Sequence, residues 1–408
     1  MQKRQPITTK RAKPAVKKKL SKPVATIEKK ASKQLVAYVF QGGGALGAYQ
    51  VGAYKALREA GYIPDIVVGI SIGAINAAIL AGNKREDRLD RLNQFWDNMT
   101  TKMPFPMFSN YGLSKFHHFW SAAASLMIGQ PGFFTPKALN PNLIPNASPE
   151  ELSYYDTTPL RKTLIDLIDF NYLNEKHVRL CLGSVELDSG EFVFFDSFEQ
   201  EILPEHIMAS GALPPGFPPV KIGDKYYVDG GVFSNTPISK IFDEFADSEK
   251  HIKHILCFMI DLFSIKGPLP HSMDGMLERI KDIRYSSHTK RASSMYATAQ
   301  NLSHAIHYLS SKLTPEQKAD PHVQKIMKLG YAHRLDMVHL VYHSEKGTEL
   351  ESKDYEFSAE SADKHRIMGY TNTKNMIERE EAHWLNLRHS GVTLFAQDLD
   401  KTSSQRIK

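Results

Sequence analysis

Two strand-turn-helix units are visible in the hydrophobic pattern of residues 34–82. Residues 34–40 form a short apolar run, typical of a buried strand, which stops at three glycines. Apolar residues then recur near helical spacing over 45–60, and the apolar run 66–68 leads through a Gly-Ile-Ser-Ile-Gly turn to a helical stretch at 74–81. Two consecutive units of this kind predict a parallel sheet covered by helices.

The rest of the chain continues the strand pattern and then becomes mainly helical. Further strands are expected at 178–184, 192–196, 226–228 and 254–261, with helices between them. The α/β unit, residues 34–265, is followed by a mainly helical extension, residues 266–408. There we expect helix over 273–329, a strand at 337–342 and helix over 359–389. The extension is either a small accessory module or a set of additional layers on the same core.

Residues 95–150 interrupt this pattern with many Pro, Met and aromatic residues. The aromatic ones are Phe105, Phe108, Tyr111, Phe116, Phe119, Trp120, Phe133 and Phe134. We expect an insertion over the sheet. It serves either as ordinary core packing or as an apolar lid or wall beside a bound acyl chain.

Residues 63–82 are long and apolar enough to suggest a membrane span. They contain Asp65, Ser71 and Asn76 and an internal turn, so we interpret them as buried strand, turn and helix. The polar, Lys-rich N-terminus lacks the apolar segment of a secretory signal. We therefore expect a cytoplasmic protein, with peripheral attachment to a membrane as an option.

The formal net charge of +6 is unevenly distributed along the chain. Residues 1–33 hold 12 Lys and Arg and a single acid, Glu28, so the remainder is mildly acidic. We predict that this basic arm is disordered. It is either a solubilising tail or a contact to anionic lipid headgroups, where each basic residue contributes about 1 kcal/mol. Nucleic acid is a weaker candidate because the arm has no aromatic residues, and no protein partner is indicated.

The two cysteines, Cys181 and Cys257, lie in separate apolar runs without neighbours at metal-ligand spacing. They are expected to be buried thiols in a reducing compartment. The sequence predicts neither a metal site nor a cofactor.

A glycine-rich loop, Gly42-Gly43-Gly44-Ala45-Leu46-Gly47, stands between the first strand and the first helix. Glycines leave backbone N–H groups able to converge on an anion at a helix N-terminus. The spacing also fits a dinucleotide-binding fold, which needs an acidic residue at the end of the next strand. Because Asp65 precedes that strand, the dinucleotide interpretation is disfavoured.

Ser71 lies at the centre of the second strand-to-helix turn. Such a sharp turn holds a serine in a strained conformation that requires small neighbours, here Gly69 and Gly73. The side chain then projects at the carboxyl end of the sheet, beside a helix N-terminus that stabilises developing negative charge. Ser71 is the candidate nucleophile.

A nucleophilic serine needs a proton acceptor, and Asp229 is the candidate. It follows the strand 226–228 and precedes Gly230 and Gly231, whose bare backbone lets another loop approach closely. By itself such a sequence is most often a turn. The alternative base is a histidine, for which His251, His254 and His271 follow Asp229 in the chain order of an ordinary hydrolase triad.

Together these motifs resemble the patatin-like phospholipase family, over residues 37–261. Similarity extends to 209–220 (Ala-Ser-Gly-Ala-Leu-Pro-Pro-Gly-Phe-Pro-Pro-Val) and 228–237 (Val-Asp-Gly-Gly-Val-Phe-Ser-Asn-Thr-Pro). Residues beyond about 270, including Arg366 and Gly369-Tyr370, resemble the C-terminal extension of a bacterial subgroup. No chemistry is assigned to that extension.

The resemblance implies a three-layer α/β/α fold and an esterase with a Ser71–Asp229 dyad, Gly42–Gly44 amides as oxyanion hole and no metal. Phospholipids, lysophospholipids, acylglycerols and storage polyesters are all open as substrates. Many family members carry a basic residue where this chain has Leu46. A non-catalytic lipid-binding or regulatory module on the same fold is therefore the alternative.

Overall fold

The computed structural model describes residues 34–100, 129–130, 132–242, 254–330, 334–343, 351–384 and 392–396. Four sequence predictions lie wholly or partly outside the described residues. These are the arm at 1–33, the aromatic residues from Phe105 to Trp120, His251, and the end of the last predicted helix at 385–389.

A nine-stranded sheet forms the centre of the fold, in the order β11-β10-β9-β1-β2-β5-β8-β7 with β6 paired to β5. Its parallel strands are β1 (Gln34–Phe40), β2 (Ile66–Gly69), β5 (Arg179–Glu186), β9 (His254–Asp261), β10 (Arg334–Val341) and β11 (Val392–Ala396). Antiparallel strands complete one side: β6 (Phe192–Asp196), β7 (Val220–Ile222) and β8 (Lys225–Asp229). The strands predicted from the sequence are confirmed, within a few residues at their ends.

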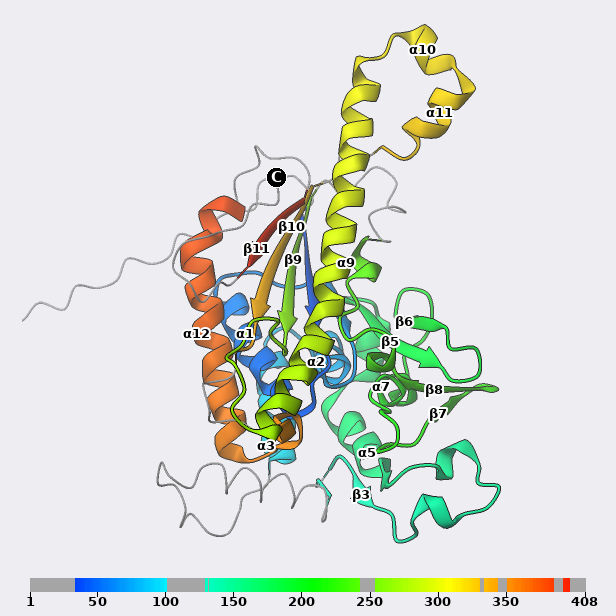
Figure 1. The fold of residues 1–408 in the computed structure, drawn as a ribbon, viewed down its shortest axis with the longest axis vertical. Coiled ribbons are helices and arrows are strands. Elements are labelled where there is room, and N and C mark those ends of the chain that lie inside the picture. Colours follow the sequence, from blue (N-terminus) through cyan, green and yellow to red (C-terminus); the bar gives the residue numbers. More distant parts are fainter. Residues whose placement is uncertain are drawn as a thin grey trace, which may run out of the picture. The chain divides into compact units, whose positions relative to one another are not determined.

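Helices cover both faces of the sheet (Figure 1). One face packs against α1 (Ala48–Glu59), α2 (Ile72–Ala81), α3 (Arg88–Met99) and α12 (Ala359–Trp384), and the other against residues 238–242 and the long helix α9 (Met273–Lys312). Side chains alternate along β1, so Tyr38 and Phe40 enter the first core and Ala37 and Val39 the second. The predicted three-layer α/β/α fold with a mostly parallel sheet is confirmed.

Smaller elements connect these layers. They are η1 (Gly44–Gly47), β3 (Thr135–Pro136), η2 (Pro141–Leu143), η3 (Pro149–Glu151), β4 (Tyr155–Asp156), α5 (Thr158–Leu167), α6 (Phe170–Asn174), α7 (Pro204–Ser210), η4 (Gly230–Val232), α10 (Pro315–Ala319), α11 (Pro321–Met327) and η5 (Glu351–Tyr355). The helix predicted over 273–329 is thus divided into α9, α10 and α11, because Pro315 and Pro321 each start a new helix.

The C-terminal strands and helix are built onto the same sheet. β10 pairs with β9, and α12 crosses α1 with backbones in direct contact. A Cβ on Gly369 would lie 2.0 Å from the carbonyl oxygen of Tyr49. Next to this crossing, Arg366 pairs with Asp97 at 3.0 Å. The motif 366–370 therefore serves helix packing.

Residues 63–82 fold as β2, a turn and α2, as predicted. Among the described helices, none combines the length and apolar character needed to cross a bilayer. Cys181 and Cys257 are both buried and unpaired, also as predicted, and burial raises the pKa of each thiol.

Candidate active site

Ser71 occupies the turn between β2 and α2. Its backbone has φ 56° and ψ −127°, outside the region that side-chain-bearing residues prefer. Its neighbours must be small: a Cβ on Gly69 would lie 2.4 Å from the carbonyl oxygen of Gly73, and a Cβ on Gly73 would lie 2.4 Å from that of Phe40. The Ser71 amide donates to the carbonyl oxygen of Ser210 at 3.0 Å. Four different segments thus hold the serine at the N-terminus of α2.

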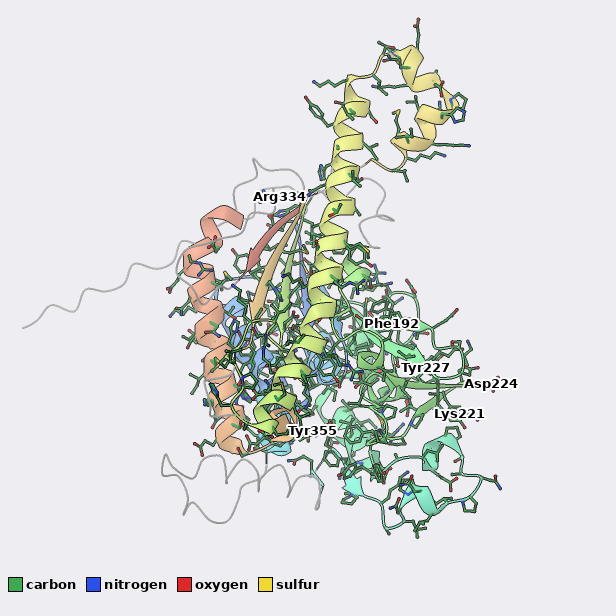
Figure 2. The ribbon with its side chains drawn as sticks, viewed as in Figure 1. Phe192, Lys221, Asp224, Tyr227, Arg334 and Tyr355 are labelled. Atoms are coloured by element: carbon green, nitrogen blue, oxygen red, sulfur yellow. The ribbon has the colours of Figure 1, made fainter. Side chains whose placement is uncertain are left out.

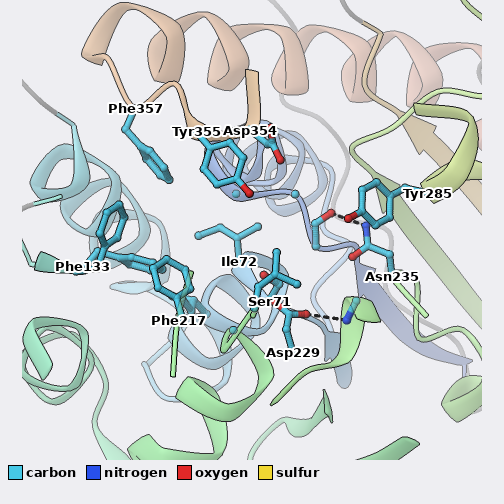
Figure 3. A pocket seen from close by; sticks show the side chains of 18 of the residues that line it. Ser71, Ile72, Phe133, Phe217, Asp229, Asn235, Tyr285, Asp354, Tyr355 and Phe357 are labelled. Carbon is cyan, nitrogen blue, oxygen red and sulfur yellow. Dashed lines mark hydrogen bonds between the residues drawn. The ribbon is translucent and has the colours of Figure 1, made fainter. Parts of the chain in front are cut away.

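Asp229 ends β8 and lies next to Ser71 in the pocket (Figure 3). Its carboxylate accepts the Gly231 N–H at 2.7 Å, and the Ser71 side chain lies close enough to lower the pKa of this carboxyl group. Burial raises the pKa of Asp229 to about 7, although the Gly231 N–H and the Ser71 side chain both act to lower it. Gly230 is needed for this approach, because a Cβ there would lie 2.7 Å from the carbonyl oxygen of Gly183.

The glycine loop lies beside Ser71 because β1 and β2 are parallel and in register, with Phe40 opposite Gly69. The amide of Gly42 donates to the carbonyl oxygen of Asn235 at 3.3 Å. Among the hydrogen bonds of the described residues, none engages the amide of Gly43 or Gly44. Gly43 and Gly44 both line the pocket, so their amides are the candidates for binding an oxyanion, whereas the Gly42 amide predicted with them is engaged by Asn235.

Leu46 of the glycine loop is not among the residues that line the pocket. Its side chain is fully buried in the core between η1, α1 and the sheet. Gly47 allows η1 to pack there, since a Cβ would lie 2.6 Å from Ile72 and 2.9 Å from Trp96. Position 46, where the family resemblance suggested a basic residue, is therefore part of the core in this chain.

Asn235 is a pocket residue that the sequence did not single out. Its side-chain amide donates to the backbone carbonyl oxygen of Gly42 at 2.8 Å. The backbone carbonyl oxygen of Asn235 in turn accepts the Gly42 N–H. Asn235 thereby joins the loop after Asp229 to the glycine loop (Figure 3). Its presence six residues after Asp229 gave no signal, because an asparagine in a loop is ordinarily a turn former.

A buried polar network holds the glycine loop from behind. Gln41 accepts the Leu262 N–H at 2.6 Å, and its carbonyl accepts from Gln50 at 2.7 Å. Asn76 donates to Gln50 at 2.8 Å and accepts from Trp96 at 3.1 Å. Polar residues inside apolar helices were the only sequence signal for this network, and their partners are set by tertiary contacts.

The pocket beside Ser71 has an apolar and a polar side. Phe133, Phe134 and Phe217 pack together on the apolar side, with ring centroids 5.2 to 5.7 Å apart. The full lining is Gly42, Gly43, Gly44, Ser71, Ile72, Ile75, Phe133, Phe134, Gly211, Leu213, Phe217, Asp229, Gly231, Asn235, Phe263, Tyr285, Asp354, Tyr355 and Phe357. Two aromatics of the predicted insertion, Phe133 and Phe134, are thus pocket residues.

The C-terminal third supplies the opposite wall, which the sequence did not predict. Tyr285 comes from α9, and Asp354, Tyr355 and Phe357 come from η5 and the residues after it. Asp354 pairs with Lys281 of α9 at 2.7 Å. Its backbone carbonyl also abuts Gly44, where a Cβ would lie only 2.1 Å away.

The residues of the alternative interpretations lie elsewhere. His254 starts β9 and bonds Asp336 at 2.8 Å, opposite Arg334 in register. Figure 2 shows Arg334 far from Tyr355, which borders the pocket. His271 is exposed in the loop before α9, and no histidine is among the described residues that line the pocket.

Asp65, the acid considered for a dinucleotide, accepts the Val36 N–H at 2.8 Å. Asp65 precedes β2 and so lies at the amino-terminal end of the parallel strands, whereas the glycine loop lies at their carboxyl end.

Short stretches of the chain are similar to curated proteins. Lysophospholipase nte1 of Aspergillus terreus is 56% identical over 46 residues, which are 11% of this chain and 3% of that protein. Neuropathy target esterase sws of Drosophila melanogaster is 36% identical over 67 residues, 16% of this chain and 5% of that protein. The chain thus spans a small fraction of these curated relatives.

Solved structures are more distant. Human GIVD cytosolic phospholipase A2 has a TM-score of 0.41 and 12% identity, covering 86% of this chain and 59% of that one. VipD from Legionella pneumophila has a TM-score of 0.36 and 16% identity, covering 85% and 67%.

Two family models match the chain directly. One, described as patatin phospholipase, matches residues 283–388, which include α12 and the pocket residues of η5. The other, described as patatin-like phospholipase, matches residues 38–241, half of the chain, which contain the glycine loop, Ser71 and Asp229. The chain therefore belongs to the patatin-like phospholipase family.

Proposed function

We propose that this protein is a serine hydrolase that cleaves acyl-ester bonds of lipids. The observation that carries the proposal is the placement of Ser71 and the buried carboxylate of Asp229 side by side in one pocket, which Gly43 and Gly44 also line. This arrangement supports Ser71 as nucleophile, Asp229 as base and the Gly43 and Gly44 amides as oxyanion donors.

In the acylation step, Asp229 takes the proton of Ser71 as the serine oxygen attacks the ester carbonyl carbon. The carbonyl oxygen becomes an oxyanion, which accepts hydrogen bonds from Gly43 and Gly44 beside the N-terminus of α2. The carbon–oxygen bond to the alcohol then breaks. Asp229 returns the proton to the departing alcohol, and the acyl group stays on Ser71.

In the deacylation step, water takes the place of the alcohol. Asp229 accepts a proton from the water as its oxygen attacks the acyl carbon, and the same amides hold the oxyanion. The bond to Ser71 breaks, the serine oxygen regains the proton from Asp229, and the fatty acid leaves.

The substrate class rests on the pocket lining. Phe133, Phe134 and Phe217 offer an apolar surface for an acyl chain, and Asp354 and Tyr355 form a polar side where an alcohol moiety would lie. The names lysophospholipase and esterase of the curated relatives agree with a lipid ester. Attachment of residues 1–33 to anionic membranes stays a separate prediction.

The dyad is tested by hydrolysis of a p-nitrophenyl acyl ester. Ser71→Ala and Asp229→Asn are each expected to lower kcat by about 10³-fold or more. Ser189→Ala, in the exposed turn between β5 and β6, is the matched control and should keep full activity. Undiminished activity of the Ser71 or Asp229 variant would rule out the dyad.

The alternative, a lipid-binding module without turnover, is favoured by Leu46 in the place of a basic residue. A fluorophosphonate probe separates the two functions. An enzyme is labelled at Ser71 and loses the label in Ser71→Ala, whereas a scaffold is labelled in neither form.

A further inference from the structure

The first turns of α9 expose a continuous apolar face. Met273, Met276, Leu277, Ile280 and Ile283 have relative exposures of 76%, 45%, 50%, 54% and 44%. Their spacing places them on one side of the helix. Arg284 is the other exposed residue between 273 and 286. We call these five apolar residues the α9 face.

The opposite side of the same turns is polar and packed inward. Asp282 and Ser286 are buried, and Asp282 accepts from the buried Lys353 at 2.8 Å. Lys353 also contacts Glu278 at 3.1 Å. This is the reverse of a surface helix of a globular protein, whose apolar side faces the core. Packing among the residues that the structure describes therefore does not account for the α9 face.

The α9 face lies beside the pocket. Tyr285, on the next turn, lines the pocket, and Lys281 pairs with the pocket residue Asp354. Figure 2 shows Tyr355, at the end of η5, next to the first turns of α9. Directly after Asp229, Val232 and Phe233 are also exposed, at 55% and 60%. Apolar side chains thus stand near the pocket on two different elements.

We propose that the α9 face is a docking surface for the acyl-chain region of a lipid bilayer or micelle. The proposal rests on the proposed function, because a lipid ester resides in such an assembly and must pass from it into the pocket. Insertion of Leu277 and Ile280 brings the pocket to the lipid, and Arg284 meets the headgroup phosphates. A second copy of the chain seated here would instead crowd the pocket that the substrate must enter.

The decisive variant is the double substitution Leu277→Glu, Ile280→Glu, with Met273→Glu as a milder second variant. Sedimentation with phosphatidylcholine vesicles at high salt measures apolar binding, since salt screens any attraction by the basic arm. We expect binding of the double variant to fall about ten-fold or more. Hydrolysis of a vesicle-embedded ester should fall in proportion, while hydrolysis of a short, dispersed p-nitrophenyl ester stays within about two-fold, which also shows that the variant is folded.

Leu302→Glu is the matched control. Leu302 is exposed to 60% on the same helix, and lies roughly 33 Å further along its axis from Ile280. It should bind vesicles like the wild type. Three results would overturn the proposal: unchanged vesicle binding by the double variant, an equal loss for Leu302→Glu, or conversion of a dimer to a monomer by the double variant in size-exclusion chromatography.

The docking test does not depend on turnover. Ser71→Ala should bind vesicles like the wild type, because Ser71 lies inside the pocket and not on the α9 face. If the wild type bound vesicles through the α9 face but hydrolysed no ester, the proposed hydrolase activity would fail while the docking surface stood.

Discussion

Asp229→Asn is predicted to make the protein more stable while it removes the catalytic base. Burial raises the pKa of Asp229 from 3.8 to about 7 in the folded protein. A carboxyl group with a raised folded-state pKa binds its proton more tightly when folded. It favours folding below pH 3.8 and loses that contribution as the pH rises through about 7.

The size of the effect follows from the two pKa values. Each unit of pKa difference corresponds to 1.36 kcal/mol, so the ionised carboxylate costs up to about 4 kcal/mol of unfolding free energy above pH 7. Asparagine carries no charge and keeps an oxygen for the Gly231 N–H. The stability gain of Asp229→Asn should therefore be small near pH 4 and grow to between about 1 and 4 kcal/mol near pH 8.

Urea unfolding, followed by the fluorescence of the buried Trp96, measures this gain at several pH values. Asp196→Asn is the control of opposite sign. Burial would raise the pKa of Asp196, but hydrogen bonds from Arg179 and Lys240 hold it at about 2, so its ionised form stabilises the fold. That variant should be less stable than wild type at pH 7. A stability difference between Asp229→Asn and wild type that does not change with pH would refute the argument from burial.

Three further predictions concern the same site and its support. The rate constant kcat/KM should rise with pH and level off above about 7, because Asp229 must be ionised to take the serine proton; a flat profile from acid to neutral pH would contradict this. Asn235→Ala and Asn235→Asp both remove the donor to the Gly42 carbonyl and should lower kcat about ten-fold with little change in KM, whereas equal effects on both would indicate a different role. Gly369→Leu should cost about 3 kcal/mol of stability in urea unfolding, because its Cβ would meet the Tyr49 carbonyl, and a wild-type midpoint would show that the helices can separate.

The strand-turn-helix units could be predicted from the sequence because their determinants are local. Glycines at 69 and 73 mark a turn that only small residues permit, and Ser71 lies between them. Periodicity over a few residues likewise identified β1, β2, β5, β6, β8, β9 and β10, but not the short strands β3, β4 and β7. Once Ser71 and the glycine loop each end a parallel strand, their proximity at the same edge of the sheet follows.

The rest of the site depends on contacts between distant segments, which local pattern does not encode. Asp229 approaches Ser71 because β8 pairs antiparallel with β5, and Asn235 holds Gly42 across a large sequence separation. The wall formed by Tyr285, Asp354 and Tyr355 exists because α9 and η5 pack beside the glycine loop.

In helix α9 the sequence determines which residues share a face, and the tertiary structure determines which face is buried. The spacing of Met273, Leu277 and Ile280 determines that they share one side of a helix. Which side faces the core is set by the partners available, and here Lys353 draws Glu278 and Asp282 inward. A buried charge requires an opposite charge nearby, and that partner comes from a segment about 70 residues away in the chain. The sequence therefore determines that α9 has an apolar and a polar face. The ion pairs with Lys353 turn the polar face inward, which exposes the apolar face beside the pocket.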